Sequence, residues 1–370
     1  MNSKETTEAI LEEYKKFDCQ QMEREKLVDR WFPYTFNPSV GHSTLSFLRE
    51  NDPKAFKQMH IVIPAVCIRD IDFARAPYDK RLTLFKMIAF FSARTKMGEA
   101  ILQYINILRN LDLDTDKLIW TMWGGGILGT SLWNKYLPPD KESEEVLREL
   151  GFEHIYKNCS ASNYLFPSIH RGIIYAGPRV EVFYELPNHE YIEVGTIQKI
   201  DHVVNKNDAG APALIPLEEI GLNRFITIAS GAERLEMAIN GYREIWQTDS
   251  FKQYLTSLRS IVPYLDLFKQ NVFDVIDKFR AISFALFDGA NELPADDLRK
   301  KLLNRFAEVA IRRGQEIGYS DDNFWKLLYE QVATIEGEEF VGFAAKKDDC
   351  TNFMHGQRDA IMRWDPDSWF

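Results

Sequence analysis

The hydrophobic and polar positions divide the chain into two parts with different periods. An amphipathic helix is expected over residues 1–17, with Ile10, Leu11, Tyr14 and Phe17 on one face. Short strand-like segments follow, separated by turns and a few helices. We expect these strands at residues 60–68, 117–123, 172–176, 179–185, 190–200 and 224–228, with loops at residues 137–143 and 205–216.

From about residue 250 the period becomes that of helices. Apolar residues recur there every three or four positions, and glycines punctuate the pattern. We expect helices at residues 251–261, 262–287, 295–318 and 322–335. The pattern therefore predicts an α+β fold with a mixed domain at residues 1–250, followed by an all-helical domain at residues 251–370.

Composition limits the function without defining it. The 370 residues are 45% hydrophobic, enough for one large core and a smaller one. A net charge of −10 and a pI near 5.4 argue against a broad basic face for nucleic acid. The four cysteines show no CxxC pair, the N-terminus does not read as a secretory signal, and no apolar run is long enough to cross a membrane. We therefore expect a cytoplasmic protein with no membrane partner.

One local pattern points to a ligand. A partly β-branched run at residues 225–230 stops at Gly231, and an amphipathic helix with Arg234 in its first turn begins there. A helix start offers free backbone N–H groups to an anion, and a guanidinium can fork onto phosphate. Junctions of this kind also occur as purely structural features. By itself the pattern indicates a nucleotide site only weakly.

The neighbouring segments, in their order along the chain, strengthen this interpretation. They are residues 67–69 with 85–92, residues 117–123, 177–185 and 191–196, residues 231–235 with 248–251, and the helical segments 280–284, 288–289 and 311–314. Together they resemble the catalytic core of the alanyl-tRNA synthetases, which are class II aminoacyl-tRNA synthetases. The resemblance covers about residues 60–320 and implies an antiparallel sheet flanked by helices, followed by a helical domain like the middle domain of that family. It also implies a stand-alone paralogue without the family's editing and C-terminal domains.

The resemblance implies binding of ATP and Mg²⁺. Joining a carboxylate to the α-phosphate builds negative charge at phosphorus, so cations have to be fixed there beforehand. By resemblance, Arg69 bridges the α-phosphate and the substrate carboxylate, and Arg234 binds ATP; both are candidate catalytic residues. The implied ATP-binding residues are Arg69, Phe91, Gly231 and Arg234. Phe91 would lie under the adenine, although a phenylalanine in such a run is more often part of a core.

A divalent ion requires carboxylate ligands. The resemblance gives this role to Glu193, with Glu181 as a weaker second candidate. The alternative for both residues is an ordinary solvent-facing position on a strand. For Glu181 the sequence favours this alternative nearly as much as a metal ligand.

The amino-acid site departs from the family's pattern. The family has an aspartate that pairs with the substrate ammonium, and this chain has Thr227 at the matching position, followed by Ala229 in place of a glycine. Leu165 replaces a tryptophan and Thr196 an asparagine. The candidate substrate-site residues are Leu165, Glu181, Thr196, Gln198, Thr227 and Ala229. Because a buried ammonium without a carboxylate is costly, alanine bound in the family's way is disfavoured unless Glu181 or Asp201 takes over.

These patterns favour an adenylate-forming ligase. It would activate an amino acid or a related carboxylic acid and pass it to a small-molecule amine or hydroxyl in specialised biosynthesis. Transfer RNA remains a possible partner, because residues 296–318 carry six basic and four acidic residues, a net charge of +2. The alternatives are an aminoacyl-tRNA ligase of altered specificity and a non-catalytic, synthetase-like binding or regulatory protein. By resemblance to class II cores, a homodimer is one expected state.

Overall fold

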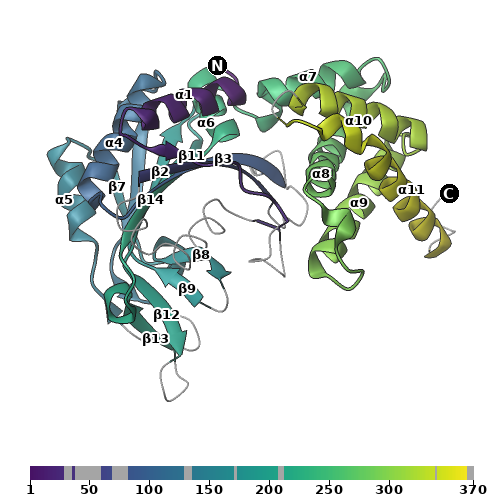
Figure 1. Cartoon of the computed structure of the whole chain (residues 1–370). Coiled ribbons are helices and arrows are strands. Elements are labelled where there is room, and N and C mark those ends of the chain that lie inside the picture. Colours follow the sequence, from purple (N-terminus) through teal and green to yellow (C-terminus); the bar gives the residue numbers. More distant parts are fainter. Residues whose placement is uncertain are drawn as a thin grey trace. The chain divides into compact units, whose positions relative to one another are not determined.

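The computed structural model describes residues 1–28, 36–37, 60–68, 82–128, 136–170, 173–206, 212–337 and 340–364. The strands are β1 (Gln20–Gln21), β2 (His60–Ile68), β3 (Leu84–Ser92), β4 (Leu118–Trp123), β5 (Gly126–Ile127), β6 (Tyr136–Leu137), β7 (Ile155–Asn158), β8 (Leu165–His170), β9 (Ile173–Ala176), β10 (Arg179–Glu185), β11 (Tyr191–Ile200), β12 (His202–Lys206), β13 (Pro212–Pro216) and β14 (Phe225–Gly231). The α-helices are α1 (Ser3–Lys15), α4 (Met97–Asn110), α5 (Lys141–Glu149), α6 (Ala232–Asn240), α7 (Asp249–Leu258), α8 (Lys269–Phe287), α9 (Leu298–Glu316), α10 (Asp322–Glu336) and α11 (Lys347–Trp364). A mainly antiparallel sheet, flanking helices and a helical C-terminal region confirm the predicted α+β fold class (Figure 1).

The chain divides into two compact units. The first includes Met1–Glu25 and Lys86–Arg243 and contains most of the large sheet. The second includes the chain from Glu244 onward, where the described residues form only helices. Every candidate site residue that the structure describes lies in the first unit. Among the described helices, none is long and apolar enough to cross a membrane.

The large sheet has the strand order β1-β2-β3-β14-β11-β10-β4-β7. From β3 to β4 each pair with a described register is antiparallel, whereas β1 runs parallel to β2 and β4 runs parallel to β7. Side chains alternate between the two faces along each strand. The register therefore decides which side chains meet on a face.

One face of this sheet is apolar and covered by helices. Val180, Ile197, Ile228 and Phe90 are successive cross-strand partners on β10, β11, β14 and β3. All four are almost completely buried. Helices α1, α4 and α6 lie on this side (Figure 1), where the Tyr14 ring of α1 stacks on Phe90 with centroids 5.1 Å apart. The polar side chains of the same strands consequently occupy the opposite face.

Tyr104 of α4 fixes the helix layer to the sheet. Its hydroxyl donates to the carbonyl of Val194 at 2.7 Å and accepts from Oγ of Ser230 at 3.0 Å. A Cβ atom built at Gly195 would lie 2.1 Å from the same hydroxyl oxygen. Position 195 therefore needs glycine because the helix approaches the strand closely there.

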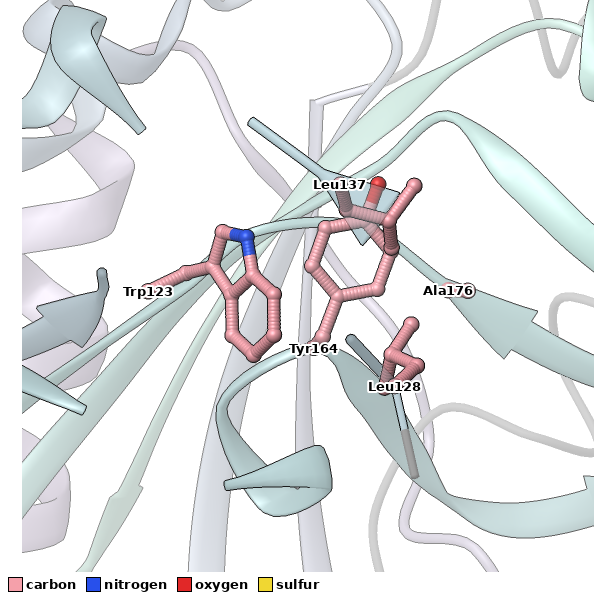
Figure 2. Close-up of a cluster of buried hydrophobic side chains, with 5 residues drawn as sticks. All are labelled: Trp123, Leu128, Leu137, Tyr164 and Ala176. Carbon is pink, nitrogen blue, oxygen red and sulfur yellow. The ribbon is translucent and has the colours of Figure 1, made fainter. Parts of the chain in front are cut away.

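A second antiparallel sheet has the order β13-β12-β9-β8. A buried cluster joins it to the end of the large sheet (Figure 2), and its members are Trp123, Leu128, Leu137, Tyr164 and Ala176. The Trp123 ring meets the Tyr164 ring edge-on, with centroids 5.1 Å apart. Packing of this kind holds the backbone at Tyr164 next to the large sheet.

In the second unit, α8 is buried along most of its length. The Arg280 guanidinium of α8 donates to Oε1 of Glu336 in α10 from Nε at 3.0 Å and from Nη2 at 2.8 Å. It also lies over the Phe251 ring of α7, 5.1 Å from the centroid. This buried ion pair fixes the alignment of the three helices, because a guanidinium fork tolerates little rotation.

Two predicted loops are wrong in part. Within residues 137–143 the structure has the end of β6 and the start of α5, where the Asp140 side chain accepts from the backbone N of Ser143. Within residues 205–216 it has the end of β12 and all of β13, with Asn205 opposite Ala213. Proline and charge were read as loop signals, but an aspartate also caps a helix and an edge strand tolerates proline.

We predict that Gly195→Ala lowers the free energy of unfolding by roughly 1–3 kcal/mol, because the added methyl group overlaps Tyr104 and forces α4 away from β11. Urea denaturation followed by circular dichroism measures this. Gly356→Ala is the matched control, since a Cβ at Gly356 of α11 meets nothing within 4 Å and should leave stability unchanged or slightly higher. Equal effects of the two substitutions would contradict the packing argument.

Candidate functional site

The polar face of the large sheet gathers candidate residues in three cross-strand rows. The first row is Arg179, Gln198, Thr227 and Phe91. The second row is Thr121, Glu181, Thr196 and Ala229. The third row includes Phe183 and Glu193. Residues predicted from segments far apart in the sequence thus lie together on one surface of β4, β10, β11, β14 and β3.

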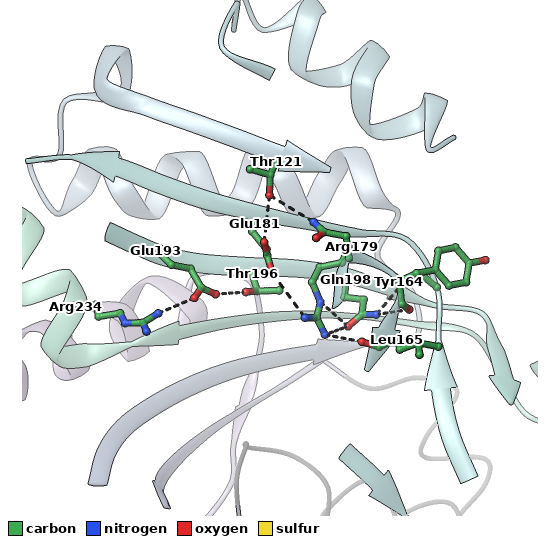
Figure 3. Close-up of polar contacts among 11 residues, drawn as sticks. Thr121, Tyr164, Leu165, Arg179, Glu181, Glu193, Thr196, Gln198 and Arg234 are labelled. Carbon is green, nitrogen blue, oxygen red and sulfur yellow. Dashed lines mark hydrogen bonds and ion pairs between the residues drawn. The ribbon is translucent and has the colours of Figure 1, made fainter. Parts of the chain in front are cut away.

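Arg179 and Gln198 form the buried end of this face (Figure 3). The guanidinium donates to Oε1 of Gln198 from Nε at 3.2 Å and from Nη2 at 3.0 Å. Nη2 also donates to the carbonyl of Leu165 at 3.1 Å. The Gln198 amide donates from Nε2 to the carbonyls of Tyr164 at 3.1 Å and Gly177 at 3.0 Å. These bonds fix the plane of the guanidinium.

Glu181 lies next to Arg179 on β10. Its Oε2 accepts from Oγ1 of Thr121 at 3.2 Å, and its Oε1 is 3.8 Å from Nη1 of Arg179. Burial raises the pKa of the Glu181 carboxyl, and the nearby charge of Glu193 raises it further, while Arg179 and the Thr121 hydrogen bond act in the opposite direction. The carboxylate is therefore held in a position where another positive charge would stabilise it.

A β-bulge places Glu193 on the polar face. Gly195 pairs with Val182, but Glu193 pairs with Phe183, so β11 has one extra residue at this point. Strict alternation from Thr196 would have turned Glu193 toward the helices, and the bulge reverses this. Oε1 of Glu193 accepts from Oγ1 of Thr196 at 2.9 Å, which fixes its direction.

Arg234 reaches Glu193 from the first turn of α6. Its Nη1 is 2.6 Å from Oε2 of Glu193, and both side chains are partly exposed. Gly231 is the residue before α6, and a Cβ there would meet nothing closer than 4.0 Å. The neighbouring Glu233 is buried and accepts from the backbone N of Lys86 through both carboxylate oxygens at 3.1 Å, which joins α6 to β3.

The remaining candidate residues are buried or partly buried and differ in which neighbours they contact. Phe91 is 2% exposed, and its ring centroid is 6.4 Å from that of Phe225. Thr227 is buried between Gln198 and Phe91, and Ala229 follows it two residues later on the same face. Leu165 contributes its carbonyl to Arg179, while its side chain packs against the buried cluster of Figure 2.

Arg69 lies outside the described residues. The sequence analysis did not select Arg179, although it lies in the matched segment 177–185. Its one visible signal is an arginine at the first position of a largely buried strand, and this signal becomes informative only with its partner Gln198. Thr121 was also missed, since a threonine in a strand carries no comparable signal.

The two carboxylates fit a magnesium ion that arrives with a nucleotide. Among the described residues, no group of three or more His, Cys, Asp or Glu side chains is placed to hold a metal. Magnesium is usually held by one or two carboxylates together with substrate phosphates. Glu193 and Glu181 would supply oxygen donors of this kind, and Arg234 lies beside Glu193.

Comparison with known proteins finds relatives among the alanine–tRNA ligases. The chain is 27% identical over 284 residues to an alanine–tRNA ligase from Staphylococcus aureus, covering 74% of this chain and 31% of that protein. It is 23% identical over 222 residues to an alanine–tRNA ligase from Coxiella burnetii, covering 56% of this chain and 24% of that protein. The chain thus spans less than a third of the length of the curated relatives it matches. No family model matches it.

The solved structures with similarity to this chain include tRNA synthetases. A histidyl-tRNA synthetase from S. aureus has a TM-score of 0.41 at 12% identity, over 72% of this chain and 78% of that one. A pyrrolysyl-tRNA synthetase from Desulfitobacterium hafniense has a TM-score of 0.37 at 10% identity, over 67% and 72%. The sequence relatives support the predicted resemblance, and the chain has a class II aminoacyl-tRNA synthetase-like core.

We predict that Glu181→Gln reduces the pH dependence of stability. Because the pKa of Glu181 is raised in the folded protein, its contribution to stability is largest below the unfolded pKa and is lost as pH rises through the folded pKa. The variant should therefore gain stability relative to the unmodified protein as the pH rises above the pKa of an unfolded glutamate, about 4.3. Urea denaturation at several pH values measures this difference. The exposed Glu153→Gln is the control, and parallel curves for both variants would contradict the assignment.

Proposed function

We propose that this chain activates an amino acid or a related carboxylic acid as its adenylate, using ATP and Mg²⁺. The observation that carries the proposal is the pairing of Arg234 with Glu193 at the start of α6. It joins a cation for phosphate and a carboxylate for a metal on the polar face of a class II synthetase-like core. The function named for the relatives, alanine–tRNA ligation, supports a ligase at the family level.

The chemistry is an in-line displacement at phosphorus. A carboxylate oxygen of the substrate bonds to the α-phosphorus of ATP, the bond to the bridging oxygen breaks, and pyrophosphate leaves with that electron pair. The carboxylate is already ionised at neutral pH, so no general base is required. Arg234 neutralises charge on the phosphates, and Arg69 would align the substrate carboxylate. A bound magnesium ion would supply further charge neutralisation at the phosphates.

The ion pair between Arg234 and Glu193 orients both side chains before the metal and the nucleotide bind. At 2.6 Å, Arg234 and Glu193 orient each other, and Thr196 holds the other carboxylate oxygen of Glu193. When the metal and nucleotide bind, Glu193 gains a cation and Arg234 gains an anion, so neither loses an opposite charge. Groups that are oriented before binding need little reorganisation during reaction.

Helix α9, which the resemblance implies would face tRNA, favours an acceptor other than tRNA. Three of the four arginines on α9 are paired with nearby acids, namely Arg299 with Asp297 at 2.7 Å, Arg312 with Glu308 at 3.1 Å and Arg313 with Glu316 at 2.7 Å. Lys300 donates to the carbonyl of Leu293 at 2.9 Å. Phosphate binding would have to compete with these partners. We therefore favour transfer to a small-molecule amine or hydroxyl in specialised biosynthesis.

A second candidate is an aminoacyl-tRNA ligase of altered amino-acid specificity. The names of the sequence relatives favour it, because each is an alanine–tRNA ligase. We place the protein in the cytoplasm in either case, since its four cysteines are free thiols, which suits a reducing compartment. A homodimer remains a prediction from the resemblance.

We predict ATP–pyrophosphate exchange that depends on a carboxylic acid. Arg234→Met should lower the exchange rate at least about 100-fold, the usual effect of removing a charge-stabilising donor. The control is Arg148→Met, an exposed arginine paired with Glu144 on α5, which should retain full exchange. Absence of exchange with every acid in a broad panel would remove the adenylation proposal and leave a binding or regulatory role.

We also predict that exchange proceeds without tRNA. Incubation with the radiolabelled acid, ATP and total tRNA should leave no label on tRNA above the enzyme-free background. In a panel of small amines and alcohols, at least one compound should instead become labelled, and AMP should be released as the acyl group is transferred to it. If tRNA becomes labelled with the unmodified protein but not with the Arg234→Met variant, the protein is an aminoacyl-tRNA ligase rather than a ligase for a small-molecule acceptor.

A further inference from the structure

Two buried charged residues of α8 hold the residue that precedes β3. Asp277 accepts from the backbone N of Thr83 through both carboxylate oxygens at 3.1 Å. Lys278 donates from Nζ to Oγ1 of Thr83, and the same Nζ is 3.5 Å from Oδ2 of Asp277. The exposed fractions of Thr83, Asp277 and Lys278 are 0%, 0% and 2%. Thr83 is thus held at its backbone and at its side chain by two neighbouring charged groups.

Stability alone does not account for this cluster. Taking two charges out of water is costly, and a well-packed apolar pair of similar volume is often as stabilising or more so. Charged hydrogen bonds do supply geometry, because they weaken when either partner moves. The cluster is therefore better explained by the position that it gives to Thr83 than by the stability that it adds.

The same helix also holds the end of β2, the neighbour of β3 in the large sheet. Oδ2 of Asp288, the residue that follows α8, accepts from the backbone N of Leu27 at 2.7 Å. The Leu27 carbonyl accepts from the backbone N of Asn37 at 3.0 Å, and the Asn37 carbonyl accepts from the backbone N of Ile68 at 3.0 Å. Ile68 directly precedes Arg69 in the sequence. One helix therefore anchors two neighbouring strands.

The start of β3 leads to the candidate site. The described register of β3 with β14 ends at Met87, short of the first residues of the strand. Lys86 donates its backbone N–H to Glu233, the residue before Arg234 in the first turn of α6. Thr83 precedes this contact by only three residues along the chain. A displacement at Thr83 would therefore reach the turn that carries Arg234.

We propose that Asp277 and Lys278 are positioning residues for the activation step, acting through the start of β3 on the turn that carries Arg234. This inference rests on the proposed function and adds residues from α8 to the same site. Their role is to fix the backbone that Glu233 binds, so that the guanidinium meets the phosphates without rearrangement.

Matched substitutions on α8 test the proposal in the full chain. Asp277→Asn keeps the shape of the side chain but turns one of the two acceptors of the Thr83 N–H into a donor. It should lower kcat of ATP–pyrophosphate exchange about 10- to 100-fold at saturating ATP and acid. Asp274→Asn is the control, because Asp274 is also buried on α8 but contacts Gln270 and Arg313. It should keep kcat within about twofold, measured where circular dichroism shows both variants folded.

The contact between Lys278 and Thr83 is tested from both sides. Lys278→Met and Thr83→Val each remove this hydrogen bond at similar side-chain volume, and each should lower kcat about 10-fold. The double variant should lower kcat no further, because both changes remove the same contact. Thr83→Ser keeps the hydroxyl and should restore exchange to near the unmodified rate. Multiplied losses in the double variant, or a Thr83→Ser variant as slow as Thr83→Val, would contradict the proposal.

A second readout separates this inference from the proposed function. Amide hydrogen exchange of peptides covering residues 82–92 should become faster in Asp277→Asn and stay unchanged in Asp274→Asn. If Asp277→Asn does not fold, Lys278→Met and Thr83→Val decide. An active unmodified protein whose folded Asp277 and Lys278 variants keep full pyrophosphate exchange rejects this inference alone. No pyrophosphate exchange by the unmodified protein with any acid rejects the proposed function, while faster hydrogen exchange confined to residues 82–92 would still support the anchor.

Discussion

The buried amide of Gln198 is the contact on which the layout of the site depends. Its oxygen accepts from Arg179 and its nitrogen donates to the carbonyls of Tyr164 and Gly177. One side chain on β11 thereby satisfies buried groups from β10 and from the segment that the Trp123 cluster holds in place. Without it, a buried guanidinium and two carbonyls would lose a partner at once, and each such loss is costly.

The two faces of the large sheet have different roles. The helix-covered face sets the spacing of the strands through close apolar packing, as Tyr104 against Gly195 shows. The opposite face carries an ordered series of charges that packing does not dictate. Because strand residues alternate between faces, a substitution in the polar rows leaves the apolar rows intact.

The sequence indicated six of the strands, namely β2, β4, β9, β10, β11 and β14, and the helical C-terminal region, because these depend on local periodicity. Segments matched in order also named most of the residues that share the polar face. The sequence did not show that Glu193 and Arg234 pair, since a contact between β11 and α6 depends on tertiary structure. Arg179 was overlooked because a charged residue at a buried position is informative only once its partner, Gln198, is known. The hairpin of β12 and β13 was missed because prolines at both ends of β13 imitate a loop.

The bulge between β10 and β11 has a consequence for how such a protein can diversify. The extra residue divides β11 into two stretches that keep register with their neighbours independently. Gln198 and Thr196 belong to one stretch, and Glu193 belongs to the other. Changes of residue or slight twisting in the first stretch need not be transmitted to the second. A single inserted residue thus lets the stretch with Gln198 and Thr196 vary while the position of Glu193 stays constant.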